Sequence, residues 1–477
     1  MGVKRSSMRK ILGNYLLISI TTLSMAIQES ENMSKKIAVV GTGYVGLVSG
    51  TGFAEVGHSV TCADIVKSKI ESLRRLQMPI YEPGLAALVE KNVQEQRLKF
   101  THDVAQAIED AEVIFIAVGT PMAADGKADL TYVEVVAQTI GQHLKVGEYK
   151  VIVNKSTVPI GMGKKIKALI SSHAPQGAEF DVVSNPEFLR EGSAVYDFLK
   201  PDRIVVGCSS TKAQEVMAYV YEPFIRRNIP IIYTTIETAE TIKYASNSFL
   251  ATKIAFINEI SRLCDKTGAD VTMVAKAMGL DHRISPYFLR PGPGFGGSCF
   301  PKDVSALAHI GDELDLDLTL VKATLESNTA QKKYVVDKLT SMAGGTLRGK
   351  SVAVLGLAFK ANTDDVRDSS ACFVIEELLK RGAQVHGYDP EAITNMKNLY
   401  PKAVYYESVY DCLRNTDAAV ILTEWDEIKA LDLEKVAELM NQCVLLDMRN
   451  LIDPKLLTDF NSRSRFFQSG LKEIQVQ

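Results

Sequence analysis

Short apolar runs rich in β-branched residues alternate with longer helix-favouring segments through the first half of the chain. Between Lys36 and Thr235 the runs are KIAVVG, SVTCAD, EVIFIAVG, KVIVNKS, FDVVSNPE, DRIVVG and PIIYTT. This alternation is typical of βαβ units, which build a doubly wound parallel sheet with helices on both faces. Residues 34–236 are therefore predicted to form a Rossmann-like α/β domain.

A helical middle follows, with no strand signal from Glu237 to Met278. Its composition predicts one long helix and then a shorter one. Four apolar positions suggest the buried face of the long helix: Ile242, Ala245, Phe249 and Ile254. Glycines and prolines in residues 290–303 predict an irregular loop, after which the helical pattern resumes to about Met342. Residues 237–346 thus form the predicted central helical region.

The strand rhythm returns after this region in the runs SVAVLGLAF, AQVHGYD, AAVILTEW and CVLLDMRN. They predict a second, smaller Rossmann-like unit over residues 347–465, with a tail at 466–477. The predicted fold class is α/β, with two doubly wound parallel sheets joined by a helical region. Two such units suggest a binding cleft between domains.

Bulk composition agrees with a multi-domain globular protein, since 46% of the 477 residues are apolar and 23% are charged. The net charge of −3 comes without long like-charge blocks, so no nucleic-acid partner is expected. Cysteines number seven, without zinc-ligand spacing, so neither a metal site nor a disulfide framework is expected. Most of them, including Cys62 and Cys443, stand in apolar runs and are predicted to be buried.

Three glycines, Gly41, Gly43 and Gly46, form GxGxxG directly after an apolar strand and before a helix-like run. The first permits a tight turn, the second lets the backbone approach a pyrophosphate, and the third allows close helix packing. Asp64 ends the next strand, where its carboxylate would accept ribose hydroxyls and repel a 2′-phosphate. The pattern therefore predicts NAD as the cofactor.

Other polar residues also follow predicted strands. At the carboxyl edge of the first sheet, Thr120 and Thr157 would either contact the cofactor or act as turn and cap residues. The second unit keeps Gly356 after its first strand but lacks the glycine triplet, so we expect it to bind something other than NAD. Nearby, Lys360 and Arg367 would meet phosphate or carboxylate oxygens, or lie solvated on the surface.

Cys299 differs from the other cysteines because glycines and a Lys-Asp pair surround it in GFGGSCFPKD. Oxidation of an alcohol past the aldehyde needs a nucleophile, since an aldehyde releases no hydride until something adds to it. A thiolate supplies such an adduct, and Lys302 would lower the pKa of the thiol. The alternative is an inert thiol beside turn glycines.

Two residue pairs with a spacing of four offer further chemistry: Glu187 with Glu191, and Lys243 with Asn247. Each pair would share one face of a helix or turn. Glu187 would then assist attack by water, while Lys243 and Asn247 would stabilise an alkoxide or oxyanion. The alternative for each pair is an exposed helix surface.

Taken together, residues 35–450 closely resemble the UDP-glucose 6-dehydrogenase family, a branch of the nucleotide-sugar dehydrogenases that make uronic acids. The most specific segments are GTGYVG at Gly41, YEPGL at Tyr81, VGTP at Val118, KSTVPIG at Lys155, NPEFLREGSA at Asn185, GFGGSCFPKD at Gly294 and GLAFKANTDDVRDS at Gly356. The resemblance implies UDP-glucose as substrate, a C-terminal UDP-binding domain and a long central helix at the interface of a homodimer or higher homo-oligomer.

The resemblance also implies roles for the matching residues. Cys299 would be the nucleophile that passes through a thiohemiacetal and a thioester, and Glu187 would promote hydrolysis of the thioester. The alkoxide, the oxyanion and an ordered water would be held by Lys243, Asn247, Asp303 and Thr157. The implied cofactor contacts are Gly41, Gly43, Tyr44, Val45, Gly46, Asp64, Lys69, Thr120, Thr157, Glu191, Lys302 and Arg367.

A further set would bind the nucleotide sugar. Its members are Glu187, Phe188, Leu189, Arg190, Glu191, Lys243, Asn247, Phe288, Leu289, Arg290, Pro291, Gly292, Gly296 and Lys360, with Arg283 reaching in from the partner subunit. Ser285 stands where the family usually has glycine, which leaves the shape of this loop open.

Residues 1–33 place basic residues before an apolar stretch and so resemble part of a signal peptide. The stretch is short and interrupted by Asn14, Thr21 and Thr22, so a membrane span is not expected. We expect a non-structural extension, with a weak targeting or anchoring segment as the alternative. Free thiols and a nicotinamide site favour the cytoplasm.

Two alternatives to UDP-glucose oxidation stay open at this point. A dehydrogenase of GDP-mannose or of a UDP-N-acetylhexosamine would share Cys299 and the glycine triplet. A catalytically silent sensor of NAD or nucleotide sugar would keep both Rossmann-like units, although the set of Cys299, Lys243, Asn247 and Glu187 argues against it.

Overall fold

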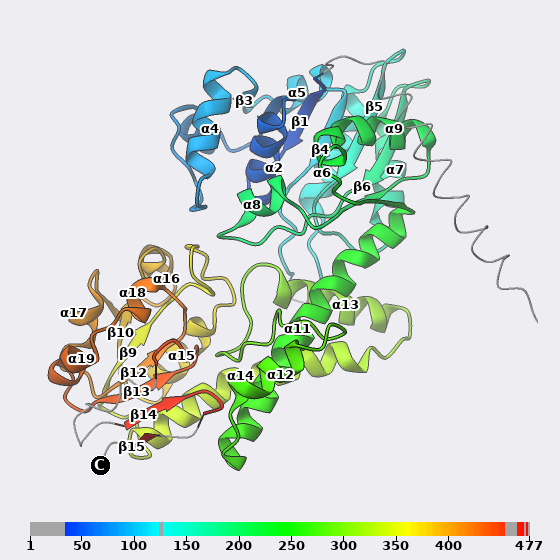
Figure 1. Cartoon of the computed structure of the whole chain (residues 1–477). Coiled ribbons are helices and arrows are strands. Elements are labelled where there is room, and N and C mark those ends of the chain that lie inside the picture. The colour runs from blue at the N-terminus through cyan, green and yellow to red at the C-terminus, as the bar shows by residue number, and fades with distance from the viewer. Residues whose placement is uncertain (1–33, 124–126, 454–464, 472–473, 476–477) are drawn as a thin grey trace, which may run out of the picture.

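The computed structural model describes residues 34–123, 127–453, 465–471 and 474–475. The signal-like stretch within residues 1–33 lies outside this range. Figure 1 shows two α/β lobes joined by a helical middle, which the long helix α11 (Ile236–Thr267) dominates. The predicted fold class is confirmed.

The first lobe contains an eight-stranded sheet of order β3-β2-β1-β4-β5-β6-β7-β8. Its strands are β1 (Lys36–Val40), β2 (Ser59–Ala63), β3 (Leu98–Thr101), β4 (Val113–Ile116), β5 (Tyr149–Asn154), β6 (Glu179–Ser184), β7 (Ile204–Gly207) and β8 (Ile231–Thr234). The strands from β3 to β6 pair in parallel, as the βαβ rhythm predicts. The short edge strand β3 carries no strong apolar run and was not predicted.

The last two strands depart from the predicted parallel sheet. β7 joins β6 antiparallel, and β8 lies parallel to β7. Residues 185–203 join β6 to β7 and comprise an irregular segment, the six-residue helix α8 (Ala194–Leu199) and a short turn before β7. This irregular segment, residues 185–193, carries several of the predicted site residues.

Helices cover both faces of the first sheet. Besides α8 they are α2 (Tyr44–Glu55), α3 (Lys67–Arg74), α4 (Leu85–Gln94), α5 (Val104–Asp110), α6 (Thr131–His143), α7 (Met162–His173), α9 (Thr211–Val220) and α10 (Glu222–Ile225). Side chains of β1 alternate between two cores, with Ile37 and Val39 on one face and Ala38 and Val40 on the other. Burial on both faces explains why the strand reads as a continuous apolar run.

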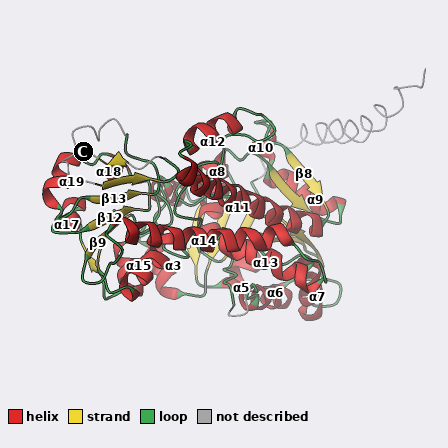
Figure 2. Ribbon diagram, turned by 90° about the horizontal axis from the view of Figure 1, so that it is seen from below, coloured by secondary structure: helices red, strands yellow, loops and turns green. Residues whose placement is uncertain are grey.

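The central region contains α11, α12 (Val271–Gly279), α13 (Phe300–Glu313) and α14 (Thr319–Met342). The predicted long helix followed by a shorter one is confirmed. Thr235 caps α11 by accepting a hydrogen bond from the Thr238 N–H, and Gly268 ends the helix at a φ of 74°. Figure 2 shows α11 and α14 side by side, with α13 next to them.

The predicted buried face of α11 is wrong. Ala245 is exposed and Phe249 is 67% exposed, whereas the polar residues Lys243 and Asn247 are buried. The helix presents polar side chains to the rest of the chain, where Lys243 binds Glu187 and Asn247 binds Asp303. Phe249, Phe256 and Leu263 are exposed, whereas Tyr244 and Ile257 are fully buried.

The second lobe contains a sheet of order β11-β10-β9-β12-β13-β14-β15. Its strands are β9 (Ser351–Leu355), β10 (Gln384–Tyr388), β11 (Val404–Tyr405), β12 (Ala418–Ile421), β13 (Val444–Asp447), β14 (Arg465–Gln468) and β15 (Ile474–Gln475). Its helices are α15 (Ser370–Lys380), α16 (Ile393–Leu399), α17 (Val409–Leu413), α18 (Asp426–Lys429) and α19 (Leu433–Leu439). The four predicted strands are β9, β10, β12 and β13, and among the described strands of this sheet only β15 runs antiparallel to its neighbour.

The irregular loop before α13 is buried, and amide side chains satisfy its backbone. Asn258 accepts the Gly292 N–H at 2.8 Å, and Gln331 donates to the Gly292 carbonyl at 2.7 Å. Asn328 pairs with both the N–H and the carbonyl of Phe295, at 2.8 and 3.0 Å. The neighbouring helices α11 and α14 therefore hold the loop in one conformation.

Replacing Asn328 with alanine should release this loop. Both backbone groups of Phe295 would be buried without their side-chain partner, which costs about 1–3 kcal/mol for each unsatisfied group. We expect faster amide hydrogen exchange at Phe295 and an earlier urea unfolding transition. Thr329→Ala on the exposed side of α14 is the control, and exchange at Phe295 equal in both variants would contradict this account.

Candidate active site

The glycine triplet forms an open cradle at the start of α2. Gly41 has a φ of 101°, and a Cβ there would lie 2.6 Å from the Ala117 carbonyl oxygen. A Cβ on Gly46 would collide with the Gly41 carbonyl, so the helix packs closely only with glycine. Around Gly43 no heavy atom lies within 4 Å of such a Cβ. This free space at a helix N-terminus fits a dinucleotide pyrophosphate.

Asp64 lies directly after β2, where the sequence places the ribose-binding carboxylate. It accepts hydrogen bonds from the Thr42 N–H at 2.9 Å and the Thr42 hydroxyl at 2.7 Å, and pairs with Lys69 at 3.1 Å. Burial alone would raise the pKa of Asp64, but these hydrogen bonds and that of the Val66 N–H hold it below its usual value. The carboxylate is therefore an acceptor at neutral pH.

The two threonines predicted at the sheet edge do lie together. Thr120 donates its hydroxyl to the Thr157 carbonyl at 2.9 Å. This bond joins the loops after β4 and β5 at the carboxyl edge of the sheet. Their contact with a cofactor stays a prediction.

A buried ion pair joins the loop after β6 to α11. The Lys243 Nζ lies 2.8 Å from a Glu187 carboxylate oxygen and 2.8 Å from the Glu187 carbonyl oxygen. Burial would raise the pKa of Glu187, but Lys243, the Leu189 N–H and Lys155 lower it below its usual value. Burial would lower the pKa of Lys243, but Glu187, Cys299 and Asp303 raise it. Both groups are therefore charged at neutral pH.

A second polar cluster lies one helical turn further along α11. The Asn247 amide donates to Asp303 at 2.6 Å, and Lys302 pairs with the other Asp303 oxygen at 2.7 Å. Asp303 is fully buried in the first turn of α13, next to Cys299. The predicted pairing of Lys243 and Asn247 on one helix face is confirmed.

Cys299 stands at the N-cap of α13 and is partly exposed. Burial raises the pKa of its thiol to about 11, against the lowering effect of Lys243. Lys243, rather than the predicted Lys302, is thus the cation that most favours the thiolate, because Asp303 engages Lys302. The thiol is therefore protonated at neutral pH.

Glu191 and Glu187 have different partners, and the helix that would place both carboxylates on one face is not formed. Residues 185–190 form no helix, and Glu191 instead accepts the Ser298 hydroxyl at 2.8 Å. Arg367 of the second lobe approaches Glu191 at 3.4 Å and pairs with Asp365 at 2.7 Å. Burial and Asp365 raise the pKa of Glu191 to about 7. Glu191 therefore joins the segment beside Cys299 to the second lobe.

The predicted substrate segment from Phe288 to Gly292 lines the boundary between the central region and the second lobe. At Gly292 a Cβ would lie 3.1 Å from the Arg449 guanidinium, and at Gly296 it would collide with the Asp368 carbonyl. Ser285 adopts a φ of 69°, a conformation that favours glycine. This explains why glycine suits the position, and Lys253 holds the preceding Ile284 carbonyl at 3.0 Å.

Four other predicted substrate residues have different surroundings. Arg283 is exposed and paired with Asp281, and Arg190 is exposed and paired with Asp197. The Phe188 ring stacks under the Arg203 guanidinium at 3.6 Å. Burial lowers the pKa of Lys360, while the charge of Glu191 raises it, which places Lys360 toward the first lobe.

Sequence reasoning missed Lys155 and Arg449. Lys155 is buried beneath Glu187 and donates to the Asn185 side chain at 3.1 Å, and burial lowers its pKa to about 8. Arg449 follows β13 and donates to the Leu422 carbonyl at 2.8 Å. Both residues stand just after a strand, Lys155 in KSTVPIG and Arg449 in DMRN. This position was the available signal.

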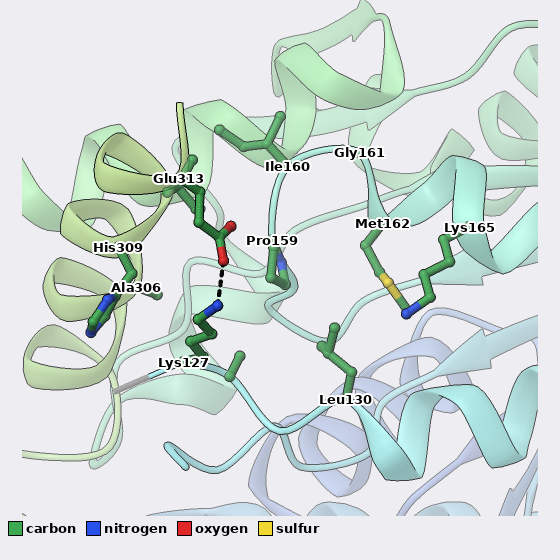
Figure 3. A pocket seen from close by; sticks show the side chains of 12 residues that line it. Lys127, Leu130, Pro159, Ile160, Gly161, Met162, Lys165, Ala306, His309 and Glu313 are labelled. Atoms are coloured by element: carbon green, nitrogen blue, oxygen red, sulfur yellow. Dashed lines mark hydrogen bonds and ion pairs between the residues drawn. The ribbon is translucent and has the colours of Figure 1, made fainter. Parts of the chain in front are cut away.

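A pocket of about 360 Å³ lies between the first lobe and α13 (Figure 3). Pro159, Ile160, Ala306 and His309 contribute to its walls, and Lys127 pairs with Glu313 at its edge. It does not include Cys299. Within the described residues no cluster of His, Cys, Asp and Glu suited to a metal ion is present, and no helix is long and apolar enough to cross a bilayer.

The high pKa of Cys299 predicts how the free protein reacts with iodoacetamide. Alkylation of Cys299 should accelerate by about tenfold per pH unit between about pH 7 and pH 9, because the thiolate fraction grows at that rate below a pKa of about 11. Lys243→Met should slow it at each pH, and Lys302→Met is the matched control. Mass spectrometry of the Cys299 peptide measures the rate, and a plateau near pH 8 would contradict the assignment.

Family models match all three regions of the chain. Residues 35–225 match the NAD binding domain of the UDP-glucose/GDP-mannose dehydrogenase family, residues 237–330 its central domain and residues 353–454 its UDP binding domain. The first match confirms NAD as the predicted cofactor.

Similar proteins agree with these matches. The UDP-glucose 6-dehydrogenase TuaD of Bacillus subtilis is 52% identical over 87% of this chain and 89% of its own length. The UDP-glucose 6-dehydrogenase of Rhizobium meliloti is 48% identical over 87% of this chain and 95% of its own. A solved UDP-glucose dehydrogenase from Pyrobaculum islandicum superposes with a TM-score of 0.83 at 40% identity, covering 88% of this chain and 95% of that one. By sequence and by structure, this chain belongs to the UDP-glucose/GDP-mannose dehydrogenase family.

Proposed function

We propose that this chain oxidises UDP-glucose at C6 to UDP-glucuronate, with NAD as cofactor and Cys299 as covalent catalyst. The observation that carries the proposal is the grouping of the Cys299 thiol with the charges of Lys243, Glu187 and Asp303, all of which act on its pKa. Under this proposal residues 34–236 bind the cofactor, residues 237–346 supply most of the reacting groups, and residues 347–465 bind the nucleotide.

The first oxidation converts the C6 hydroxyl to an aldehyde. NAD, when bound, supplies the hydride acceptor for this step and for the second oxidation. The Lys243 ammonium and the Asn247 amide donate hydrogen bonds to the C6 oxygen and so stabilise the developing alkoxide. The hydroxyl proton leaves through an ordered water held by Asp303 and Thr157.

The second oxidation begins when the Cys299 sulfur adds to the aldehyde carbon. A carbon–sulfur bond forms, the carbonyl π bond breaks, and the thiol proton ends on the former carbonyl oxygen as a thiohemiacetal. Loss of a hydride from carbon and of the hydroxyl proton gives a thioester. Lys243 assists twice, since its positive charge favours the thiolate and the oxyanion.

Hydrolysis then releases the acid. Glu187 is ionised because Lys243 lowers its pKa, so it can accept a proton from the water that attacks the thioester. The carbon–sulfur bond breaks, and the sulfur takes up a proton to regenerate the thiol. The ion pair with Lys243 orients the carboxylate toward Cys299.

UDP-glucose is the favoured substrate because the relatives with about half of their residues identical are named UDP-glucose 6-dehydrogenase. Lys360 and Arg449 stand near the boundary between lobes, where they would bind the diphosphate and the nucleotide. A solved UDP-N-acetylmannosamine dehydrogenase, 26% identical with a TM-score of 0.75, keeps a second sugar class as the alternative. The free thiols and the NAD requirement favour the cytoplasm.

The outer face of α11 supports self-association. Phe249, Phe256 and Leu263 are 67, 46 and 56% exposed and recur every seventh residue. Such a stripe lies along one side of a helix, and contiguous exposed apolar side chains mark interaction surfaces. We therefore propose that two copies pair through α11, which would let Arg283 of one copy approach the site of the other.

The stoichiometry of reduced cofactor tests the proposed reaction. Two NADH should form for each UDP-glucose consumed, because the thioester requires a second hydride transfer. Cys299→Ser should lose uronate production by at least about a thousandfold while still binding UDP-glucose. One NADH per sugar, or near-normal uronate from the variant, would refute the covalent route, and a panel of nucleotide sugars would separate the two substrate classes.

Charge on the α11 stripe should break the proposed pairing. Phe249→Glu combined with Phe256→Glu would place carboxylates in an apolar interface, where desolvation opposes association. Sedimentation velocity should change from a dimer or larger species to a monomer. Tyr132→Glu, on the 52% exposed position of α6, is the control. An unchanged sedimentation coefficient in the double variant would contradict pairing through α11.

A further inference from the structure

Glu82 is a buried carboxylate that the proposed reaction does not use. It belongs to the YEPGL segment, in the turn before α4, and is 6% exposed. Gly84, two residues later, adopts a φ of 80° and lets the chain turn into the helix. A carboxylate costs free energy to bury unless hydrogen bonds compensate, so its partners indicate what it does.

The partners of Glu82 come from two separate segments. One carboxylate oxygen accepts the Gly192 N–H at 2.6 Å and the Tyr44 hydroxyl, and the other accepts the Ala194 N–H at 2.7 Å. The Gly192 N–H also lies 3.0 Å from the Tyr44 hydroxyl. Burial raises the pKa of Glu82, and these N–H groups and the charge of Lys360 oppose the increase. The Glu82 carboxylate, the Tyr44 hydroxyl and the N–H groups of Gly192 and Ala194 thus form one hydrogen-bonded cluster.

One side of the cluster is the cofactor cradle. Tyr44 follows Gly43 and is the first residue of α2, where the backbone N–H groups face the open space for a pyrophosphate. A ligand that draws this first turn toward itself must also move or lock the base of the Tyr44 side chain. Its hydroxyl is held by Glu82.

The other side of the cluster is the segment that carries the acidic site residues. Gly192 lies near the end of the irregular segment 185–193, which contains Glu187, the partner of Lys243, and Glu191, the partner of Ser298. Gly192 has a φ of 78°, and a Cβ there would lie 2.7 Å from the Asn362 carbonyl oxygen of the second lobe. The segment is therefore confined between Glu82 and the second lobe.

We propose that Glu82 is a positioning residue that couples the cofactor cradle, through Tyr44, to the segment of residues 187–193, so that cofactor and nucleotide sugar strengthen each other's binding. The inference rests on the proposed function for the identity of the sugar. Because coupling between two sites is reciprocal, either ligand reports it. A carboxylate suits this role, since it accepts from the hydroxyl and from two N–H groups at once.

A residue that only stabilises the fold would behave differently. Its loss lowers the stability of the fold and weakens the binding of each ligand independently, and it leaves the effect of one ligand on the binding of the other unchanged. Loss of a coupling residue lowers the mutual effect even where each ligand alone binds normally. The ratio of the dissociation constants of UDP-glucose without and with NADH separates the two roles.

Calorimetry of the unproductive pair NADH and UDP-glucose on the native chain measures this ratio without turnover. The dissociation constant of UDP-glucose should fall by about fivefold or more when NADH is saturating. Tyr44→Phe and Glu82→Gln should each bring the ratio of constants close to one, and the double variant should lower it no further. Tyr44→Phe keeps the cradle backbone and removes one hydroxyl, so it tests the idea even if Glu82→Gln folds poorly.

Glu90→Gln, on the exposed side of α4, is the matched control and should keep the native ratio. A native ratio of one, or an unchanged ratio in Tyr44→Phe, would overturn the inference while leaving the proposed function intact. If NADH binds and UDP-glucose does not bind the native chain at all, the proposed function fails and the inference fails with it.

Discussion

The ion pair between Lys243 and Glu187 connects the long helix to the first sheet and sets the position of the site. The two charges lie 2.8 Å apart and are 3 and 6% exposed. Removing one partner of such a pair leaves a buried charge, which typically costs about 3–5 kcal/mol. The charge of Lys155 and a hydrogen bond from the Leu189 N–H further favour the ionised Glu187. The arrangement therefore persists only while α11 and the loop after β6 stay in register.

The polar inner face of α11 follows from this constraint. Lys243, Asn247 and Asn258 recur along one side of the helix and reach Glu187, Asp303 and Gly292 respectively. One helix thereby aligns the acidic loop of the first lobe, the cysteine-bearing end of α13 and the loop toward the second lobe. Phe249, Phe256 and Leu263 lie exposed on the outer face, where a second copy would cover them in the proposed dimer, while Tyr244 and Ile257 are buried within the chain.

The second lobe contacts the first at Glu191 and Gly192. Arg367 approaches Glu191 at 3.4 Å, and the Thr363 hydroxyl lies 3.4 Å from the other oxygen of the same carboxylate. Close packing of Gly192 against Asn362 adds a steric contact that glycine alone allows. The acidic segment, residues 185–193, thus contacts both Glu82 of the first lobe and Asn362 and Arg367 of the second.

The sequence by itself determined the elements whose chemistry is local. The glycine triplet, the apolar runs of the two sheets and the helical middle were readable because turn geometry and burial on both faces leave a periodic trace. Cys299 and the pairing of Lys243 with Asn247 could also be inferred, since a loop composition and a helical spacing identify them. The family resemblance added roles that spacing could not supply.

Only the tertiary structure decided which groups face one another. It separated Glu187 from Glu191, assigned the cation beside Cys299 to Lys243, turned Phe249 outward and brought Lys155 beneath Glu187. Glu82 and Tyr44 meet although 38 residues separate them along the chain. Such contacts depend on how sheets, loops and helices pack, and side chains distant in sequence leave no periodic signal of their meeting.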